Sequence, residues 1–453
     1  MREAISSIAA LLLSLGLLLA GTGMFGTFIG LRTALEGFPK EATGLMMSAF
    51  YAGMMFGTLY LGRLINRVGH IRAFATFCAL CAAAMLAFPF AISVPAWALL
   101  RAITGVSIAG AYMVVESWLN TRASERTRGT LLSLYMMTSY VALGGGQQLM
   151  RVGDTAGLEL FLLAALLVVI GVIPVAVTTA SYPPPVESSH FGLRKLWEIS
   201  PVAVIGCLGS GLTTGALFGM APLFAQDVGM SLGGISTFMT VILASGLLLQ
   251  LPIGRLSDRL DRRKVIIGVG FTCLVVSAGM VLALGLGSCT MMSPAGEVTM
   301  LAPGFTPWLL LVAGAFGGVS ATIYPLSVAY ANDYIEPRDM IQASAGLLLA
   351  YGVGASMGPI ASAAVMRLTG PVGLFHFTAL VAALLTLFAL YRTRKRSWVP
   401  VVAKESFVPM ADVIASPVPL ELDPRCEGTQ LELDLSGGGV EPSAAAAAES
   451  RGA

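Results

Sequence analysis

Long apolar stretches alternate with short polar interruptions along most of the chain, and this pattern predicts membrane-spanning helices. A hydrocarbon core of about 30 Å needs about 20 consecutive apolar residues in a helix. The first stretch follows Arg2 but is too long for a signal peptide, so we interpret it as an uncleaved helix. Twelve stretches have the required length: 6–30, 43–64, 71–93, 96–118, 130–150, 157–180, 201–225, 232–254, 264–287, 307–331, 341–366 and 372–392.

The Lys and Arg residues between these stretches are distributed unequally, which predicts the orientation of the chain. Membrane proteins keep an excess of Lys and Arg in their cytoplasmic loops. The connections after the even-numbered stretches, together with the two chain ends next to the membrane, hold 19 of these residues, and the opposite connections hold four. We therefore expect the amino and carboxyl ends to be cytoplasmic.

One polar connection occurs twice and divides the chain into two similar units. Residues 254–264 have the sequence GRLSDRLDRRK, and residues 62–72 have GRLINRVGHIR. The same shift of 192 positions pairs Gly37 with Gly229. Such repetition indicates a duplicated structural unit, and an even number of spans gives both units the same orientation. The expected fold is an all-α membrane protein with 12 transmembrane helices in two parallel six-helix bundles related by pseudo-symmetry.

Changes in composition set the expected domain limits. We expect an N-terminal bundle at 1–180, a cytoplasmic linker at 181–200, a C-terminal bundle at 201–396 and a cytoplasmic tail at 397–453. The tail is rich in Pro, Gly, Ala and acidic residues, a composition typical of disorder, and it is expected to be disordered and structurally dispensable. An inserted loop near 288–306 explains a larger shift between the repeats further along the chain.

The overall composition agrees with a membrane protein and excludes several function classes. Hydrophobic residues make up 56% of the chain and charged residues 11%, against about a quarter charged in soluble domains. The histidines are dispersed, and Cys78 and Cys81 lie within one apolar stretch, where we interpret them as packing residues. We therefore expect no metal, no cofactor, no nucleic-acid partner and no enzymatic activity.

Two sets of residues resemble signatures of the major facilitator superfamily of secondary transporters. The repeated connection is similar to its G-x-L-x-D-R-x-x-R-R motif. A second pattern, R-x-x-x-G-x-x-x-A-G, is matched by Arg101, Gly105, Ala109 and Gly110. Residues 116–120, with 324–326 and 354–359, look most like the bacterial YcaD-like branch. Close helix packing is expected at Gly105, Gly110, Gly354, Gly358 and Pro359.

The resemblance covers about residues 1–396 and implies a monomeric secondary transporter in the bacterial inner membrane. Such proteins move a small organic solute by alternating access, with or without proton coupling. Facilitated diffusion and a receptor or assembly factor that uses the same scaffold without transport are the alternatives. The sequence leaves the substrate and the direction of transport open.

In this family the repeated motif latches the two bundles together on the cytoplasmic side. The Asp258 carboxylate is expected to face a helix N-terminus of the other bundle and to pair with Arg259 or Arg262. Asn66 in the first copy has no charge, so we expect an asymmetric latch dominated by Asp258. Alternatively, the arginines only fix the topology. The expected latch residues are Gly62, Asn66, Arg67, Arg72, Gly254, Asp258, Arg259, Arg262 and Arg263.

Arg101 lies near the start of the fourth predicted helix, away from the basic connections. An arginine at the centre of a membrane helix costs about 2.5–3.5 kcal/mol on insertion scales, so it should face a partner or a wet cavity. The resemblance implies that it binds an anionic substrate group or influences a proton carrier. The alternative is an arginine that reaches to the outer membrane interface.

Two acidic residues near the cytoplasmic helix ends are candidates for proton coupling. Glu116 lies 15 residues beyond Arg101 on the fourth helix, and Asp333 follows the tenth helix near Arg338. Each carries protons or serves as a counter-ion for nearby arginines. The first, seventh and eleventh helices contain no acidic residue in mid-membrane, so the sequence does not require proton coupling.

The resemblance implies a central cavity walled by the first, fourth, seventh and tenth helices. Their polar residues are Thr22, Thr27, Ser107, Tyr112, Ser210, Thr213, Thr214, Ser320, Thr322 and Tyr324, joined by Gln147 and Gln148 from the fifth helix. With one guanidinium, these groups favour a small neutral or anionic organic molecule over a hard cation. Alternatively, the Ser and Thr hydroxyls bond to their own helix backbone. The expected partners are this solute, the lipid bilayer and, if transport is coupled, protons.

Overall fold

The computed structural model describes residues 2–123, 127–177, 193–287, 290–292, 298–300, 307–335 and 340–393, together with Phe407 and Met410. The first bundle consists of α1 (Arg2–Leu35), α2 (Lys40–Val68), α3 (His70–Ala87), α4 (Val94–Arg122), α5 (Arg128–Leu149), α6 (Glu159–Ile170) and α7 (Val172–Ala176), with short 3-10 turns at Phe88–Phe90 and Met150–Val152. The second consists of α9 (Pro201–Asp227), α10 (Leu232–Arg259), α11 (Arg262–Gly287), α12 (Pro307–Ser320), α13 (Ile323–Asn332), α14 (Met340–Thr369) and α15 (Gly373–Thr393). The short α8 (Leu193–Ile199) precedes the second bundle.

The expected all-α membrane fold is confirmed. Eleven helical segments of the described chain are long and apolar enough to cross a membrane, and α6–α7 and α12–α13 each count as one such segment. The remaining long helix, α5, has 22 residues and ends in the polar Gln147–Gln148 pair. At 1.5 Å per residue it is about 33 Å long, which is also sufficient to span a hydrocarbon core.

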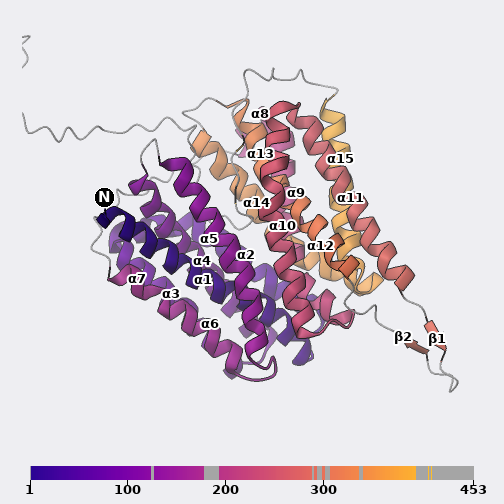
Figure 1. The fold of residues 1–453 in the computed structure, drawn as a ribbon, viewed down its shortest axis with the longest axis horizontal. Coiled ribbons are helices and arrows are strands. Elements are labelled where there is room, and N and C mark those ends of the chain that lie inside the picture. Colours follow the sequence, from indigo (N-terminus) through magenta and orange to yellow (C-terminus); the bar gives the residue numbers. More distant parts are fainter. Residues whose placement is uncertain are drawn as a thin grey trace, which may run out of the picture.

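The two bundles repeat the same helix pairings. In the first, α1 packs on α5, α2 on α4 and α3 on α6; in the second, α9 packs on α14, α10 on α12 and α11 on α15. The bundles meet through α1 with α9, α2 with α14 and α5 with α10. Figure 1 shows α1–α7 gathered on the left and α9–α15 on the right. The paired turn glycines Gly37 and Gly229 adopt φ angles of 73° and 78°, so the repeat extends to the turn conformation.

Glycines allow the closest of these helix pairs to approach. A Cβ atom at Gly105 of α4 would collide with the backbone of Phe50 in α2, and one at Gly354 of α14 would collide with the backbone of Leu208 in α9. Gly358 meets the α9 backbone in the same way, and Gly110 faces the ring of Phe77. Because lipid provides no hydrophobic drive between helices, such backbone contact is a principal source of association energy.

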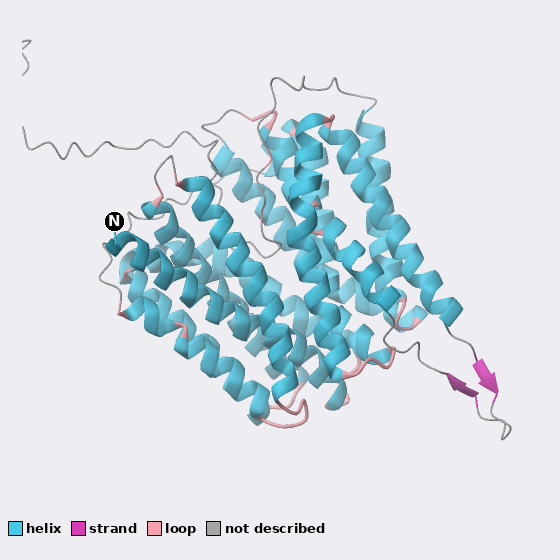
Figure 2. Ribbon diagram, in the orientation of Figure 1, coloured by secondary structure: helices cyan, strands magenta, loops and turns pink. Residues whose placement is uncertain are grey.

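The helices end at two opposite faces of the protein, which we name by the connections that they carry (Figure 1). The linker face carries the turns between α2 and α3 and between α10 and α11, together with α8. The opposite face carries the turns between α1 and α2, between α9 and α10 and between α14 and α15. The insertion before α12 contributes two antiparallel strands, β1 (Thr290–Met292) and β2 (Val298–Met300), a small departure from an all-helical chain. Figure 2 shows the strands projecting beyond the helices.

Two residues of the tail, Phe407 and Met410, belong to the described part of the chain. Phe407 and Met410 pack against the second bundle, and Met410 is buried within the hydrophobic core. The rest of 397–453 lies outside the described residues, as does most of the 181–200 linker before α8.

Candidate functional site

A cavity lies between the two bundles, close to the middle of the helices. Its free volume is about 90 Å³, and a water molecule occupies about 10–15 Å³ by the same measure, so it holds several waters or a small solute. Helices α1, α2, α4 and α5 supply most of the lining, and α9 and α10 supply the rest. The lining residues are Leu19, Thr22, Gly23, Gly26, Thr27, Met47, Phe50, Tyr51, Arg101, Ile108, Tyr112, Leu143, Gln147, Phe218, Gly219 and Leu243.

Arg101 supplies the one charged side chain of this lining. It is 5% exposed, and its guanidinium lies 4.4 Å from the centre of the Phe50 ring. One terminal nitrogen is 3.5 Å from the Met47 sulfur, a weak acceptor, and Nε has no hydrogen-bond partner. Among the described residues, no carboxylate pairs with Arg101. The guanidinium therefore retains an unused donor, Nε, and lies buried beside the cavity.

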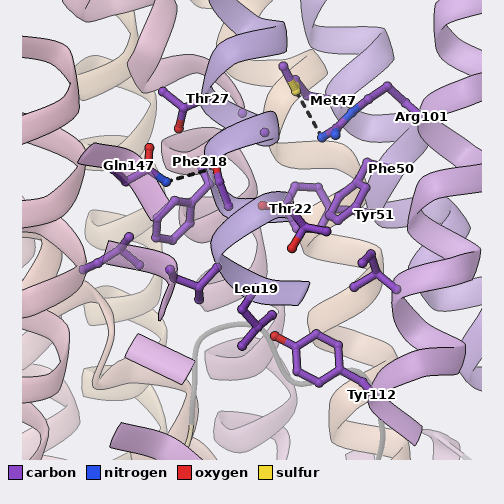
Figure 3. Close-up of a pocket in the computed structure, with 16 residues that line it drawn as sticks. Leu19, Thr22, Thr27, Met47, Phe50, Tyr51, Arg101, Tyr112, Gln147 and Phe218 are labelled. Carbon is purple, nitrogen blue, oxygen red and sulfur yellow. Dashed lines mark hydrogen bonds between the residues drawn. The ribbon is translucent and has the colours of Figure 1, made fainter. Parts of the chain in front are cut away.

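The other polar groups of the cavity are few. In the view of Figure 3, Gln147 lies across the cavity from Arg101, and Tyr112 lies at one end. The Gln147 amide donates to the Gly23 carbonyl at 3.0 Å, and its side-chain oxygen has no hydrogen-bond partner. The Thr22 hydroxyl donates to the Leu18 carbonyl of its own helix at 2.8 Å. The cavity thus combines one cation and a few neutral polar groups with an otherwise apolar wall.

Several residues expected in the cavity lie elsewhere. Thr214 is buried in α9, and the Tyr324 ring of α13 packs against Tyr351, 5.0 Å between ring centres. The tenth predicted helix, α12–α13, contributes no described residue to the lining, whereas α2, α5 and α10 do. Its hydroxyls follow the alternative expectation: Ser320 and Thr322 donate to carbonyls of the preceding helical turn.

Polar contacts between the bundles close the opposite face. The Gln148 amide of α5 donates to the Thr240 hydroxyl of α10 at 2.6 Å, so this residue joins the bundles and does not line the cavity. Nearby, Arg151 donates to the Gly233 carbonyl at 2.8 Å. Lys40 at the start of α2 pairs with Asp227 at the end of α9 at 2.5 Å.

Close backbone contact between α2 and α14 completes this closure. A Cβ atom at Gly44 would lie 2.8 Å from the Pro359 carbonyl oxygen and 2.7 Å from the Ala363 methyl carbon. A Cβ at Gly219 of α9 would also touch the Pro359 ring, at 3.0 Å. Pro359 therefore lies at the contact between the bundles, and Gly44 is small enough to let α2 and α14 approach each other.

Glu116 lies on the same helix as Arg101, towards the linker face. It is fully buried, and the Tyr135 hydroxyl of α5 donates to its Oε1 at 2.6 Å. Tyr112, one helical turn before Glu116, lines the cavity. Helix α5, which carries Tyr135, packs against α10 of the second bundle. Glu116 is thus close to the cavity and bonded to a helix that contacts the facing bundle.

The second copy of the repeated motif forms an ion-pair network within its own bundle. Arg262, 1% exposed, pairs with Asp258 at 3.0 Å and with Asp333 at 2.6 Å, and also donates to the Ala329 carbonyl. Arg263 pairs with Asp261 at 2.9 Å. Asp333 therefore pairs with Arg262; Arg338 lies outside the described residues. Among the described residues, Asp258 has no hydrogen bond or ion pair with the first bundle, so the expected latch is not formed in this structure.

The glycine of the first copy has more room than that of the second. A Cβ atom at Gly62 would be 3.7 Å from the end of the Met113 side chain, an ordinary van der Waals contact, whereas one at Gly254 would collide with the Phe407 ring. Asn66, Arg67 and Arg72 have exposed side chains, as does Arg259 in the second copy. The motif copies therefore differ in surroundings as well as in charge.

The Arg262–Asp333 pair predicts a stability effect. Replacing Asp333 with asparagine is expected to destabilise the protein by about 3–5 kcal/mol, because the buried guanidinium loses a carboxylate that is 2% exposed. Asp261→Asn breaks a more exposed pair and is expected to have a smaller effect. Thermal unfolding of both variants in detergent, followed by tryptophan fluorescence, measures the difference. Equal melting temperatures for the two variants would contradict the prediction.

Comparison with known proteins identifies the family. The profile of the Major Facilitator Superfamily matches residues 11–296 and 283–422, which is most of the chain. The chain belongs to the Major Facilitator Superfamily. It is therefore a multi-pass membrane protein of a transporter family, and membership points to a transporter that is not an enzyme.

Curated relatives from enteric bacteria support the finer resemblance to the YcaD-like branch. The chain is 30% identical to the uncharacterised MFS-type transporter YcaD of Escherichia fergusonii over 398 residues, which cover 86% of this chain and 97% of the relative. An uncharacterised MFS-type transporter of Enterobacter sp. is 30% identical over 388 residues, with 84% and 95% covered. The expected relationship to the YcaD-like branch is confirmed.

Solved structures of the superfamily share the fold. The nucleoside transporter NupG superposes with a TM-score of 0.64 at 14% identity, covering 87% of this chain and 100% of NupG. A bacterial homologue of the human lysosomal transporter Spinster, in an inward-facing and unoccupied conformation, has a TM-score of 0.63 at 15% identity, with 89% and 98% covered. At these identities the similarity shows the superfamily architecture alone.

Sequence reasoning missed most residues that join the bundles. Lys40, Gly44 and Arg151 on the opposite face were not among its candidates, and neither was Tyr140, whose hydroxyl accepts from Gln250 of α10 at 2.7 Å. One signal was available: Gln250 is an amide within an apolar stretch, and such residues in membrane helices commonly hydrogen-bond to a neighbouring helix.

Proposed function

We propose that this protein is a secondary transporter that moves a small organic solute with an anionic group by alternating access. The observation that carries the proposal is the Arg101 guanidinium, buried beside the cavity without a carboxylate partner among the described residues. A buried cation of this kind is costly unless it is compensated. A carboxylate or phosphate bound through the planar fork of donors supplies that compensation, and the apolar wall formed by Phe50, Leu143 and Phe218 accommodates the rest of the solute.

Alternating access requires the two bundles to rock around this cavity. The opposite face is held closed by Lys40–Asp227, Gln148–Thr240 and the Gly44–Pro359 contact. We propose that opening breaks these contacts while the motif carboxylate Asp258 moves to latch the linker face. Individual surface ion pairs contribute about 0–1 kcal/mol, which suits contacts that must form and break in each cycle.

The unequal distribution of Lys and Arg supports a cytoplasmic linker face, with the chain in the inner membrane of a bacterium. We propose a monomer, because the cavity and both closures lie within one chain. Substrate-dependent flux in proteoliposomes, measured with small carboxylates, phosphate esters and matched neutral compounds, tests the function. The proposal expects flux of at least one anionic compound; ligand binding without flux of any compound would instead favour the receptor alternative.

A second proposal concerns proton coupling at Glu116. The Tyr135 bond connects this buried carboxylate to α5, which packs against α10 of the second bundle, and Tyr112, one helical turn away, lines the cavity. A change in its charge would therefore alter the relative stability of the two conformations. Membrane-embedded acidic residues in transporters commonly serve this role.

The test is the substitution Glu116→Gln, which keeps the shape of the side chain and removes its titration. One pH unit supplies about 1.4 kcal/mol per proton, or about tenfold accumulation of solute. We expect the variant to lose this accumulation while retaining exchange between solute pools. The exposed Glu159→Gln at the start of α6 is the control, with accumulation unchanged. Tenfold accumulation in the Glu116 variant would exclude this residue as the proton carrier.

A further inference from the structure

Phe407 contacts Asp258, the residue that is expected to latch the two bundles together. Its backbone N–H donates to Asp258 Oδ1 at 2.9 Å, and its ring lies directly against Gly254. A side chain at position 254 would collide with that ring. Gly254 and Asp258 are the glycine and the carboxylate of the repeated motif. Of the described residues, Met113 alone would lie within 4 Å of a Cβ atom placed at the matching Gly62. The tail thus engages one copy of the motif.

Met410 lies deeper, where the two bundles meet. It is 3% exposed, and its carbonyl accepts a hydrogen bond from Gln250 Nε2 at 2.7 Å. The same amide donates to the Tyr140 hydroxyl of α5 at 2.7 Å and to the Ala321 carbonyl at 3.4 Å. One buried amide therefore connects the tail, α10 of the second bundle and α5 of the first.

The location of these contacts determines their effect. Helices α5 and α10 are bound together near the opposite face by Gln148 and Arg151. Met410 lies between the same two helices nearer the linker face, where they must approach each other when that face closes. A buried side chain at this place prevents the approach, because protein interiors are close-packed and have no spare volume.

We propose that the tail acts as an intramolecular wedge at Phe407 and Met410. The wedge keeps the linker face open, and it binds the Asp258 carboxylate so that Asp258 cannot form the latch. The transport cycle then requires release of the wedge, so the tail regulates the rate of the cycle. The wedge is held by one main-chain hydrogen bond at each of the two residues and by the contact of the Phe407 ring with Gly254. These contacts are few enough for the binding of the wedge to be reversible. Phe407 lies 14 positions beyond Thr393, the last residue of α15, and a tether of this length keeps the local concentration of the wedge high.

The first test is proximity. In a chain with all six native cysteines replaced, we introduce Phe407→Cys together with Gly254→Cys and measure disulfide formation under mild oxidation in membranes. The matched control pairs Phe407→Cys with Gly62→Cys, the equivalent position of the other motif copy. Crosslinking at position 254 but not at 62 is the expected result. Equal crosslinking of both pairs, or none in either, would overturn the proposed contact.

The second test is the effect on conformation. A cysteine at Thr27 in the cavity of the same cysteine-free chain reports access from each face when a membrane-impermeant thiol reagent is added to right-side-out or inverted vesicles. Ending the chain at Ala403 removes the wedge, and ending it at Leu420 keeps Phe407 and Met410. We expect the ratio of opposite-face to linker-face labelling to rise about threefold or more in the Ala403 form and to stay unchanged in the Leu420 form.

A point variant keeps the test independent of truncation. Phe407→Pro removes both the ring and the N–H donor, whereas Phe407→Ala removes the ring alone, so the proline form is expected to show the larger rise. Labelling ratios equal to those of the full chain in both the Ala403 and the Phe407→Pro forms would overturn the wedge. The readout needs no substrate, so that result would leave the proposed transport function standing.

Discussion

Replacing Arg101 with alanine is expected to lower solute flux by about 100-fold or more, the largest effect that we predict for any side chain of the cavity. Hydrogen bonds to charged groups contribute about 1.5–3 kcal/mol each, and a guanidinium offers a carboxylate or phosphate two at once. Arg101→Lys keeps the charge but loses the planar fork, so we expect its flux to be well below that of the native protein. Flux and ligand-induced thermal stabilisation measure both effects.

Stability distinguishes a binding role for Arg101 from a structural one. Within the described part of the chain its one hydrogen-bond acceptor is the Met47 sulfur at 3.5 Å, so removing the buried charge relieves a desolvation cost. The ligand-free Arg101→Ala protein is therefore expected to melt at the same temperature as the native protein or higher. Arg392→Ala, in the last turn of α15 and away from the cavity, is the control and is expected to change neither flux nor melting. A large drop in the melting temperature of Arg101→Ala would assign the residue a structural role.

The substitution Gly44→Val is expected to reduce transport by about tenfold or more and to shift the protein towards a conformation open at the opposite face. The new side chain would meet Pro359 and Ala363 of α14 at the point where the bundles close. Overpacking costs about 1–3 kcal/mol, and it acts on the closed conformation alone. A difference of this size changes a two-state ratio by about 5- to 150-fold.

Labelling of a cavity cysteine from the opposite face measures this shift, in the same vesicles as the transport assay. Gly145→Val is the matched control, because Gly145 lies on a helix of the same bundle with no atom of another element within 4 Å of its Cβ position. Both substitutions make the same change in helix propensity. If the two variants label at equal rates, the Gly44–Pro359 contact does not control closure.

The helices and their repetition could be predicted because they depend on local properties of the chain. A stretch of about 20 apolar residues is helical in a membrane, since every backbone group must bond within its own segment. The pairing of 62–72 with 254–264 predicted the matched helix pairs, and Gly37 and Gly229 share one turn conformation. Arg101 was identified because a charge in an apolar stretch requires an explanation.

The inward-facing side of each helix could not be predicted in this way. In a soluble helix a polar stripe marks the solvent side, but a membrane helix is apolar towards lipid and towards its neighbours alike. Consequently α2 and α10 line the cavity although only the first, fourth, fifth, seventh and tenth helices were expected to, and α12–α13 contributes no described residue to the lining. Gln148 joins the bundles although it adjoins the cavity residue Gln147.

The sequence by itself determined the membrane-spanning helices, the duplication and the presence of a buried arginine, because each follows from the composition of a continuous segment. Only the tertiary structure decided which distant groups meet: Gly44 with Pro359 between the bundles, Arg262 with Asp333 within the second bundle, and Met410 of the tail with Gln250. Such contacts join residues far apart in the chain. They depend on the rotation of each helix about its axis, which close packing fixes and hydropathy does not record.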